Sequence, residues 1–275
     1  MSLSDFVYVV AKAVSYLTLV LVVAYIFLVS FIPVIGAFAL KWELSILPEV
    51  WTLNNIKFLF EDPFVLRSLY SSLLIAGITS VLSTTVYFLV ILYLFLRERS
   101  RWVSTFIEVA VLIPLMLPAI LLALAIYEVY RPTFIGGTYW ILVSAHLTIV
   151  SPYVFRNLFS VAKMIDMKTL IEASRSLGAG VLTTAYKVIL PNIYHGLIGA
   201  MLLAFAVSFG DFEMANLLAP WQYRTVTIAI FQYFFKNAWN ASAIILLVII
   251  VSVITSFLVA YLSRKAIARY IEVVR

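Results

Sequence analysis

The residues able to do chemistry are few and scattered in this chain. It contains no cysteine and only two histidines, His146 and His195, which lie far apart in the sequence. Thiolate chemistry and disulfides are therefore excluded, and two distant histidines form no metal-binding motif. The chain has no G-x-x-x-x-G-K-[ST] phosphate loop, and no Ser–His–Asp order or carboxylate pair has a persuasive catalytic context. We expect a protein that is not an enzyme, with no catalytic residue, metal or cofactor, in which His146 hydrogen-bonds another helix.

The acidic residues Asp211 and Glu213 stand out because residues 209–213 end an apolar segment. A charged side chain at the centre of a bilayer costs about 2.5–3.5 kcal/mol. On an ideal helix the two carboxylates point about 200° apart, so they share a cavity only where Gly210 loosens the helix. The segment is therefore either a gate or part of a transport pathway, or an external cap close to Pro220.

Composition indicates that lipid surrounds most of the chain. Of the 275 residues, 64% are hydrophobic and 12% are charged, and the mean hydropathy is +1.09. Soluble domains are about 45–50% apolar and about 25% charged. Soluble, disordered, collagen-like and nucleic-acid-binding classes are therefore excluded. The net charge of +6 is then read as an excess of cytoplasmic Lys and Arg.

Charge-free runs mark the elements that must position these residues. Six runs reach or approach the roughly 20 residues that cross a hydrocarbon core, namely 13–40, 68–96, 109–127, 132–155, 188–210 and 237–263. With the N-terminus inside, the cytoplasmic segments hold 13 Lys and Arg and the external segments hold 6. The predicted fold is all-α, a polytopic membrane protein with six transmembrane helices and both termini cytoplasmic. We expect a single transmembrane domain over residues 1–275.

Small residues recur at every fourth position along the fifth predicted span, at Gly196, Ala200, Ala204 and Ser208. This spacing aligns them on one helix face, where two backbones can approach closely. We expect the face to pack on a neighbouring helix, which a second subunit could supply. Ordinary alanine richness is the alternative explanation.

The longest internal connection, residues 156–191, shows helical spacing within a loop. A helix is predicted over 167–177, and one of its faces carries Leu170, Ala173, Ser174 and Leu177. Gly178 and Gly180 are expected to end it by permitting positive φ. A second short helical run over 181–190 follows, and Pro191 is expected to fix a turn before the fifth span. Lipid headgroups or a partner protein must cover the apolar face.

This loop resembles a motif of a known family. The run Glu172-Ala173-Ser174, then Gly178, then 188–191 is similar in type and spacing to E-A-A, x3, G, x9, I-x-L-P. That motif belongs to the permease subunits of binding-protein-dependent ABC importers. Ser174 replaces the second Ala and Val188 replaces Ile, and both departures are small or isosteric.

The likeness covers roughly residues 50–265. Residues 52–63 look like the first outer loop of these permeases, and residues 113–118 look like their proline-broken third span. The resemblance implies a translocation pathway or gate formed by Pro114, Pro118, Gly210, Asp211 and Glu213. It implies a type I importer permease in a prokaryotic cell membrane.

In this family the loop is a coupling helix that docks in a groove of a separate ATPase subunit. The resemblance implies the coupling residues Glu172, Ala173, Ser174, Leu177, Gly178 and Pro191, with Glu172 facing polar or basic groups and Gly178 providing the bend. The implied partners are two ATPase subunits, an extracytoplasmic solute-binding protein and a second permease, identical or homologous. The small-residue face would meet that second permease.

The solute is the most open part of this interpretation. Residues 175–179 look more like permeases for polyamines, ferric iron, thiamine, sulfate or molybdate than like those for sugars or glycerol phosphate. An ion-coupled secondary transporter is the alternative of another class, but it needs paired ionisable groups in the bilayer. Glu108, Asp211 and Glu213 are a small supply of such groups. A purely structural membrane subunit is a further alternative.

Overall fold

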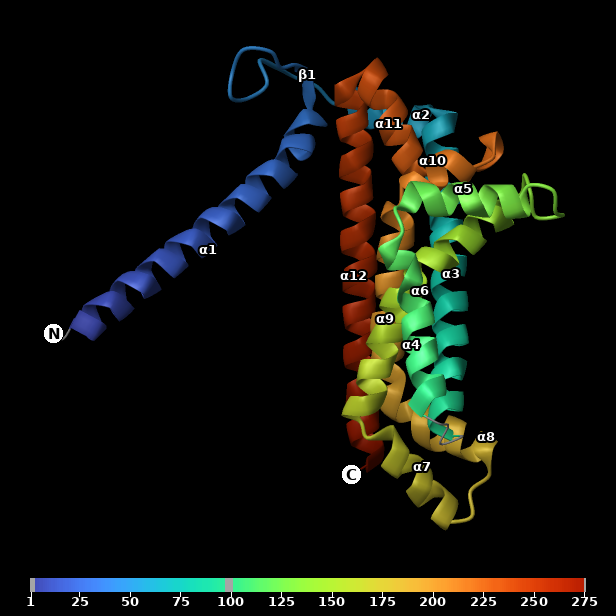
Figure 1. Cartoon of the computed structure of the whole chain (residues 1–275). Coiled ribbons are helices and arrows are strands. Elements are labelled where there is room, and N and C mark those ends of the chain that lie inside the picture. The colour runs from blue at the N-terminus through green and yellow to red at the C-terminus, as the bar shows by residue number, and fades with distance from the viewer. Residues whose placement is uncertain (1–2, 97–100, 275) are drawn as a thin grey trace. The chain divides into compact units, whose positions relative to one another are not determined.

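The computed structural model describes residues 3–96 and 101–274, and almost every element in these ranges is a helix (Figure 1). In chain order the elements are α1 (Leu3–Gly36), β1 (Ala39–Lys41), β2 (Val50–Trp51), α2 (Asn54–Glu61), α3 (Pro63–Leu96), α4 (Arg101–Met116), α5 (Ala119–Tyr130), α6 (Tyr139–Met164), α7 (Met167–Ser176), α8 (Val181–Thr183), the π-helix η1 (Thr184–Ile189), α9 (Leu190–Gly210), α10 (Glu213–Leu218), the 3₁₀ turn η2 (Trp221–Tyr223), α11 (Val226–Lys236) and α12 (Ala238–Val274). The all-α prediction is confirmed.

Four helices in the described ranges are long and apolar enough to cross a membrane, namely Val10–Gly36, Pro63–Leu96, Val181–Gly210 and Ala238–Leu258. A bent pair, Trp102–Met116 with Ala119–Tyr130, adds a fifth crossing when its halves act together. α6 is 26 residues long, and at 1.5 Å per residue it extends about 39 Å. Six spans and two cytoplasmic termini stay predictions. Arg97, Arg99 and Arg275, which contribute to the predicted orientation, lie outside the described residues.

The predicted span 109–127 consists of two helices, not one. α4 and α5 meet at 104° (Figure 1). Pro118 stands at the joint with φ −55° and ψ 132°, an extended conformation outside the helical region. A proline has no N–H to donate and restricts the residue before it, so the helix stops at Met116. The proline-broken third span that the family resemblance implies is therefore present as a sharp break.

The chain divides into two compact units, Met1–Val65 with Ile230–Ile249, and Leu66–Ala229 with Ile250–Arg275. In the first unit, Asp62 joins α2 to α3. Its Oδ1 accepts the backbone N–H groups of Phe64 and Val65 at 2.8 and 3.1 Å, and its Oδ2 accepts the Tyr233 hydroxyl. Burial, then the hydrogen bond and charge of Asp62, raise the pKa of Tyr233 to about 12. The hydrogen bond from the neutral Tyr233 hydroxyl therefore makes its full contribution to the free energy of unfolding below about pH 10. This contribution is lost as the pH rises through about 12, where the hydroxyl ionises in the folded protein.

The second unit is organised around α6, eleven of whose 26 residues are buried. One buried cluster joins α6 to α3 and α9 and includes Ile91, Leu158 and Ile193. Another joins the first half of α6 to α5 and α10 and includes Ile126 and Met214. α6 therefore connects the long helix α9 to the short helices that follow it.

The small-residue face of α9 packs within this chain. Gly196, Ala200, Ala204 and Ser208 are all buried. A Cβ placed on Gly196 would lie 2.8 Å from Cγ1 of Val161, on α6. The expectation of close helix packing is confirmed, but α6 occupies the face. Its proposed contact with a second permease is therefore wrong, because a face already filled by a helix offers no surface to another subunit.

This close approach gives a matched pair of substitutions. Gly196→Ala should destabilise the protein by about 1–3 kcal/mol, because the added methyl group overlaps Val161. Gly199→Ala lies one turn further on, where the nearest atom to a new Cβ is 4.0 Å away, and should leave stability nearly unchanged. Thermal unfolding in detergent, followed by circular dichroism, measures both. Equal effects of the two substitutions would contradict the close packing, whereas rescue of Gly196→Ala by Val161→Ala would support it.

Candidate functional site

A sharp corner connects α6 to the loop helix α7. Asp166 adopts a left-handed conformation, with φ 48° and ψ 56°, and is the one described non-glycine residue with positive φ. Its carboxylate accepts the hydroxyl of Thr169 at 2.7 Å. Aspartate tolerates this backbone region better than most residues. The sequence analysis did not identify this corner, although an Asp immediately before a helical pattern is a recognised start signal.

Helix α7 confirms the predicted loop helix and corrects its orientation. The buried side chains are Met167, Ile171 and Ser174. Ser174 lies 2.7 Å from the hydroxyl of Thr184 on η1 and is 5% exposed. Placing Ser174 on the outward face is therefore wrong, since it packs inside the loop. The residues predicted to share one face therefore lie on two sides of the helix. Ser174 is buried with Ile171, whereas Ala173 and Leu177 are exposed.

The outward side of the loop is largely apolar, and no described residue covers it. Leu177 is 89% exposed, and Leu182 is 74% exposed. We call the exposed set the coupling surface, and it consists of Glu172, Ala173, Leu177, Val181, Leu182 and Tyr186. So much exposed apolar area beside an acidic group is typical of an interaction site.

Gly178 ends α7 in the predicted way. Its φ is +77°, its N–H donates to Arg175 O at 2.9 Å, and the N–H of Ala179 donates to Ser174 O at 3.1 Å. These two bonds form a Schellman motif, in which a left-handed residue follows the helix. Gly180 is different, because its φ of −72° is ordinary. The expectation that both glycines need positive φ is therefore wrong for Gly180.

The turn expected at Pro191 is absent. Residues Val181–Gly210 form one continuous helix, and Pro191 lies in the first turn of α9. The six residues Thr184–Ile189 before it form a π-helix. A proline cannot donate to the residue four positions earlier, and its ring crowds that carbonyl group. The wider π-turn relieves this crowding without a break, so the loop leads directly into the long helix.

The helix does break after Gly210, as the gate interpretation requires. α9 ends at Gly210, Asp211 is extended with φ −69° and ψ 131°, and α10 starts at Glu213. A Cβ on Gly210 would meet nothing within 4 Å, so crowding does not require glycine there. The side chain of Asp211 stabilises the break instead. Its Oδ2 accepts the N–H of Ala215 at 3.0 Å, in the first turn of α10.

Asp211 also belongs to a buried polar cluster with His146 and Ser208. His146 Nδ1 lies 2.7 Å from Ser208 Oγ, and His146 Nε2 lies 3.3 Å from Asp211 Oδ2. The second contact has the distance of an ion pair but lacks the alignment of a hydrogen bond. The predicted helix–helix hydrogen bond of His146 is confirmed, between α6 and α9. Only the tertiary structure brings Asp211 to the same ring.

The cluster joins a serine, a histidine and an aspartate but has no features of a hydrolase. Ser208 is 4% exposed, and His146 is 1% exposed. A nucleophile needs a substrate within reach, and this hydroxyl is enclosed by helices. Glu213 is exposed, by contrast. The two carboxylates therefore do not share a cavity: one stabilises the break and the other faces outward.

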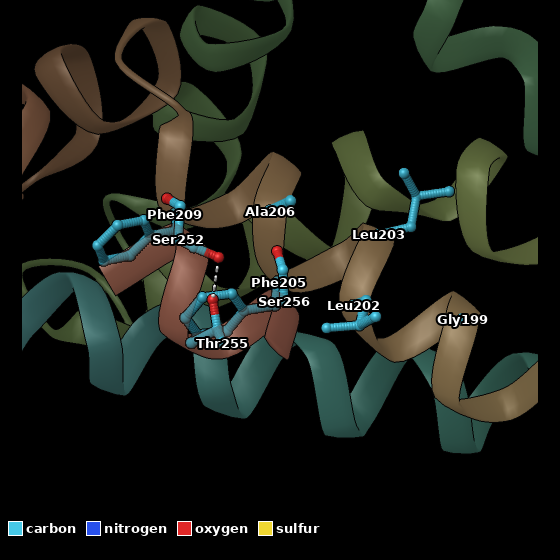
Figure 2. A pocket seen from close by; sticks show the side chains of 9 residues that line it. All are labelled: Gly199, Leu202, Leu203, Phe205, Ala206, Phe209, Ser252, Thr255 and Ser256. Carbon is cyan, nitrogen blue, oxygen red and sulfur yellow. Dashed lines mark hydrogen bonds between the residues drawn. The ribbon is translucent and has the colours of Figure 1, made fainter. Parts of the chain in front are cut away.

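A groove of about 320 Å³ runs between α9 and α12 on the side of α9 opposite its small residues. Figure 2 shows the rings of Phe205 and Phe209, from α9, close to the hydroxyl-bearing residues Ser252, Thr255 and Ser256 of α12. None of its nine lining residues is charged. The groove does not include Asp211, Glu213, Pro114 or Pro118, so it is separate from the predicted gate. In the described ranges, no three metal-ligating side chains come together.

An all-helical chain with long apolar spans, a broken span and an exposed loop helix defines a class of membrane transport subunit. Residues 97–268 match the family described as "Binding-protein-dependent transport system inner membrane component". The chain belongs to this family. It is a transport subunit of the inner membrane, and the family works with a separate ATPase and a solute-binding protein.

Curated relatives agree with this assignment. The spermidine/putrescine transport system permease protein PotC of Haemophilus influenzae is 28% identical over 63% of this chain. The match spans 66% of PotC, just under two thirds of its length. The molybdate/tungstate transport system permease protein WtpB of Pyrococcus furiosus is 23% identical over 82% of this chain and 86% of WtpB.

The fold of this chain is similar to that of a solved transporter subunit. A bacterial ABC transporter involved in the import of the acidic polysaccharide alginate contains a chain that matches with a TM-score of 0.71. The match covers 94% of this chain and 98% of that one, at 16% identity.

The polar cluster gives a second pair of substitutions. Asp211→Ala should lower stability by about 1–3 kcal/mol, because it removes the group that accepts the Ala215 N–H and leaves buried His146 without its acidic neighbour. Glu213→Ala removes a neighbouring exposed carboxylate and should change stability by less than about 0.5 kcal/mol. Thermal unfolding in detergent compares them. If Asp211→Ala is as mild as Glu213→Ala, the cluster does not stabilise the break.

Proposed function

We propose that this chain forms half of the channel of an ATP-driven importer and is moved by an ATPase subunit docked on its coupling surface. Two ATPase subunits, a second permease and an external solute-binding protein complete the transporter. ATP-driven closure of the ATPase pair would displace α7, and alternating access would follow. Membership of the importer family supports this proposal.

The observation that carries the proposal is the construction of the loop. Glu172, Ala173 and Leu177 are exposed together, whereas Ser174 anchors the helix from inside. An exposed apolar surface held on a rigid support suits a partner protein that must grip it. A helix that only lies on headgroups needs no internal anchor or fixed end.

For the solute, we propose a small polyamine such as spermidine or putrescine. PotC, named for spermidine and putrescine, is the relative that supports this choice. The exposed carboxylate of Glu213 beside the break suits a cation better than an oxyanion. The relative WtpB, named for molybdate and tungstate, makes molybdate the informative comparison.

Reconstitution of the permease with its ATPase and binding protein in proteoliposomes tests the solute. Labelled spermidine or putrescine should accumulate when ATP is present, and molybdate should not. Accumulation of molybdate alone would reject the polyamine proposal and keep the importer. Uptake that continues without ATP but stops when the ion gradient is collapsed would instead indicate a secondary transporter.

The end of the loop helix provides a test of coupling. Gly178→Val should abolish ATP-driven uptake while the protein remains inserted in the membrane. A β-branched residue is strained at positive φ by at least about 1–2 kcal/mol, so the Schellman end should open and α7 should lose its fixed direction. Gly178→Asn is the matched control, since asparagine tolerates the left-handed region and should retain most uptake. Normal uptake by Gly178→Val would show that this bend is not needed for coupling.

A further inference from the structure

We propose that α3 is a strut between the coupling loop and the helix break, and that Arg175 is the positioning residue that connects the loop to it. This inference rests on the proposed function, because it concerns how movement of α7 reaches the transport pathway. Arg175 lies on α7 beside Ser174, and its guanidinium donates to the backbone oxygen of Leu96, the last residue of α3. In Figure 1, α7 lies near that end of α3.

The physical basis of this contact is the helix end. The last four carbonyl groups of a helix have no partners within it, and the helix dipole places partial negative charge there. α3 has no basic residue in its own last turn. Arg175, 79 positions later in the chain, places a cation at this helix end. Because the arginine is exposed, we expect the contact to add little to stability, so its effect should appear mainly in coupling.

The other end of α3 reaches the break through two hydrogen bonds. Ser72, which is buried in α3, accepts the backbone N–H of Val226 at 2.8 Å. The hydroxyl of Thr227, the next residue of α11, donates to the backbone oxygen of Asp211 at 2.7 Å. Asp211 is the residue at which α9 stops. A continuous set of contacts therefore leads from Arg175, along α3, to the break.

The strut is stiff enough to transmit displacement. α3 runs without interruption from Pro63 to Leu96. The part from Ser72 to Leu96 extends about 36 Å at 1.5 Å per residue. A second connection from α7, Ser174 to Thr184, leads through the π-helix into α9. The loop therefore engages α3 and α9 at neighbouring positions, and both helices lead to Asp211.

The test uses the complete transporter in proteoliposomes, with three separate measurements. These are the affinity of the ATPase subunit for the permease, the rate of ATP hydrolysis and the solute imported per ATP. Arg175→Met should leave ATPase binding unchanged and reduce import per ATP by about 2- to 30-fold, the range expected when a coupling network loses 0.5–2 kcal/mol. Import per ATP by Arg175→Lys should lie between that of the wild type and that of Arg175→Met, because a lysine keeps the positive charge but lacks the planar guanidinium group.

Lys187→Met is the matched control, since it removes one positive charge from an exposed position of the same loop. It should leave import per ATP unchanged. Ser72→Ala should reduce import per ATP as Arg175→Met does, with thermal unfolding measured to separate misfolding from uncoupling. If both residues act through α3, the double variant should be no worse than the poorer single variant.

The outcomes separate the two proposals. If no ATPase subunit binds even the wild-type permease, the proposed function fails. If the ATPase binds and Arg175→Met imports normally, or if the effects of Arg175→Met and Ser72→Ala simply add, the strut is wrong and the proposed function stands. Reduced import per ATP with unchanged ATPase affinity supports the strut.

Discussion

A backbone inside lipid must satisfy its hydrogen bonds within the protein, and the two departures from a straight helix at the ends of α9 meet that constraint in different ways. At Pro191, where an N–H is missing, the helix widens into a π-turn and continues. At Asp211 the helix stops, and side chains replace the lost backbone bonds. The carboxylate accepts the Ala215 N–H, and the Thr227 hydroxyl donates to the freed carbonyl group of Asp211. One departure therefore preserves a continuous helix, and the other creates a joint held by side chains.

This difference assigns mechanical roles along α9. Its first end is continuous with the coupling loop, so movement of the loop is movement of the helix. Its last turn carries Ser208, which α6 holds through His146. Since the contacts at the joint are a few hydrogen bonds and the close approach of His146 to Asp211, the joint is easier to rearrange than the apolar packing around α6. A transporter that alternates between two states needs rigid levers and a small number of such joints.

The loop applies the same logic outside the spans. Its direction is determined at both ends by left-handed residues, Asp166 before α7 and Gly178 after it. Its inner side is fastened by Ser174 to Thr184 and by Arg175 to Leu96. The residues left on the outer side are those that a partner can grip. A loop held by these contacts can transmit a displacement without deforming, which is the property that the proposed coupling requires.

The sequence alone determined the lipid environment, the helical class, the loop helix with Gly178 at its end and the family resemblance, which implied the break near Pro118. A break at Gly210 was one of two alternatives. All of these depend on local patterns of apolar, charged, glycine and proline residues, which act over a few positions. It assigned Ser174 and the small residues of α9 to the wrong surroundings, and expected a turn at Pro191, because periodicity shows which residues share a face but not which neighbour that face meets. The cluster of His146, Ser208 and Asp211, and the contacts of Arg175 and Ser72 with distant backbone, were decided by the tertiary structure. Such contacts join positions up to 154 residues apart, and only the packing of whole helices brings them together.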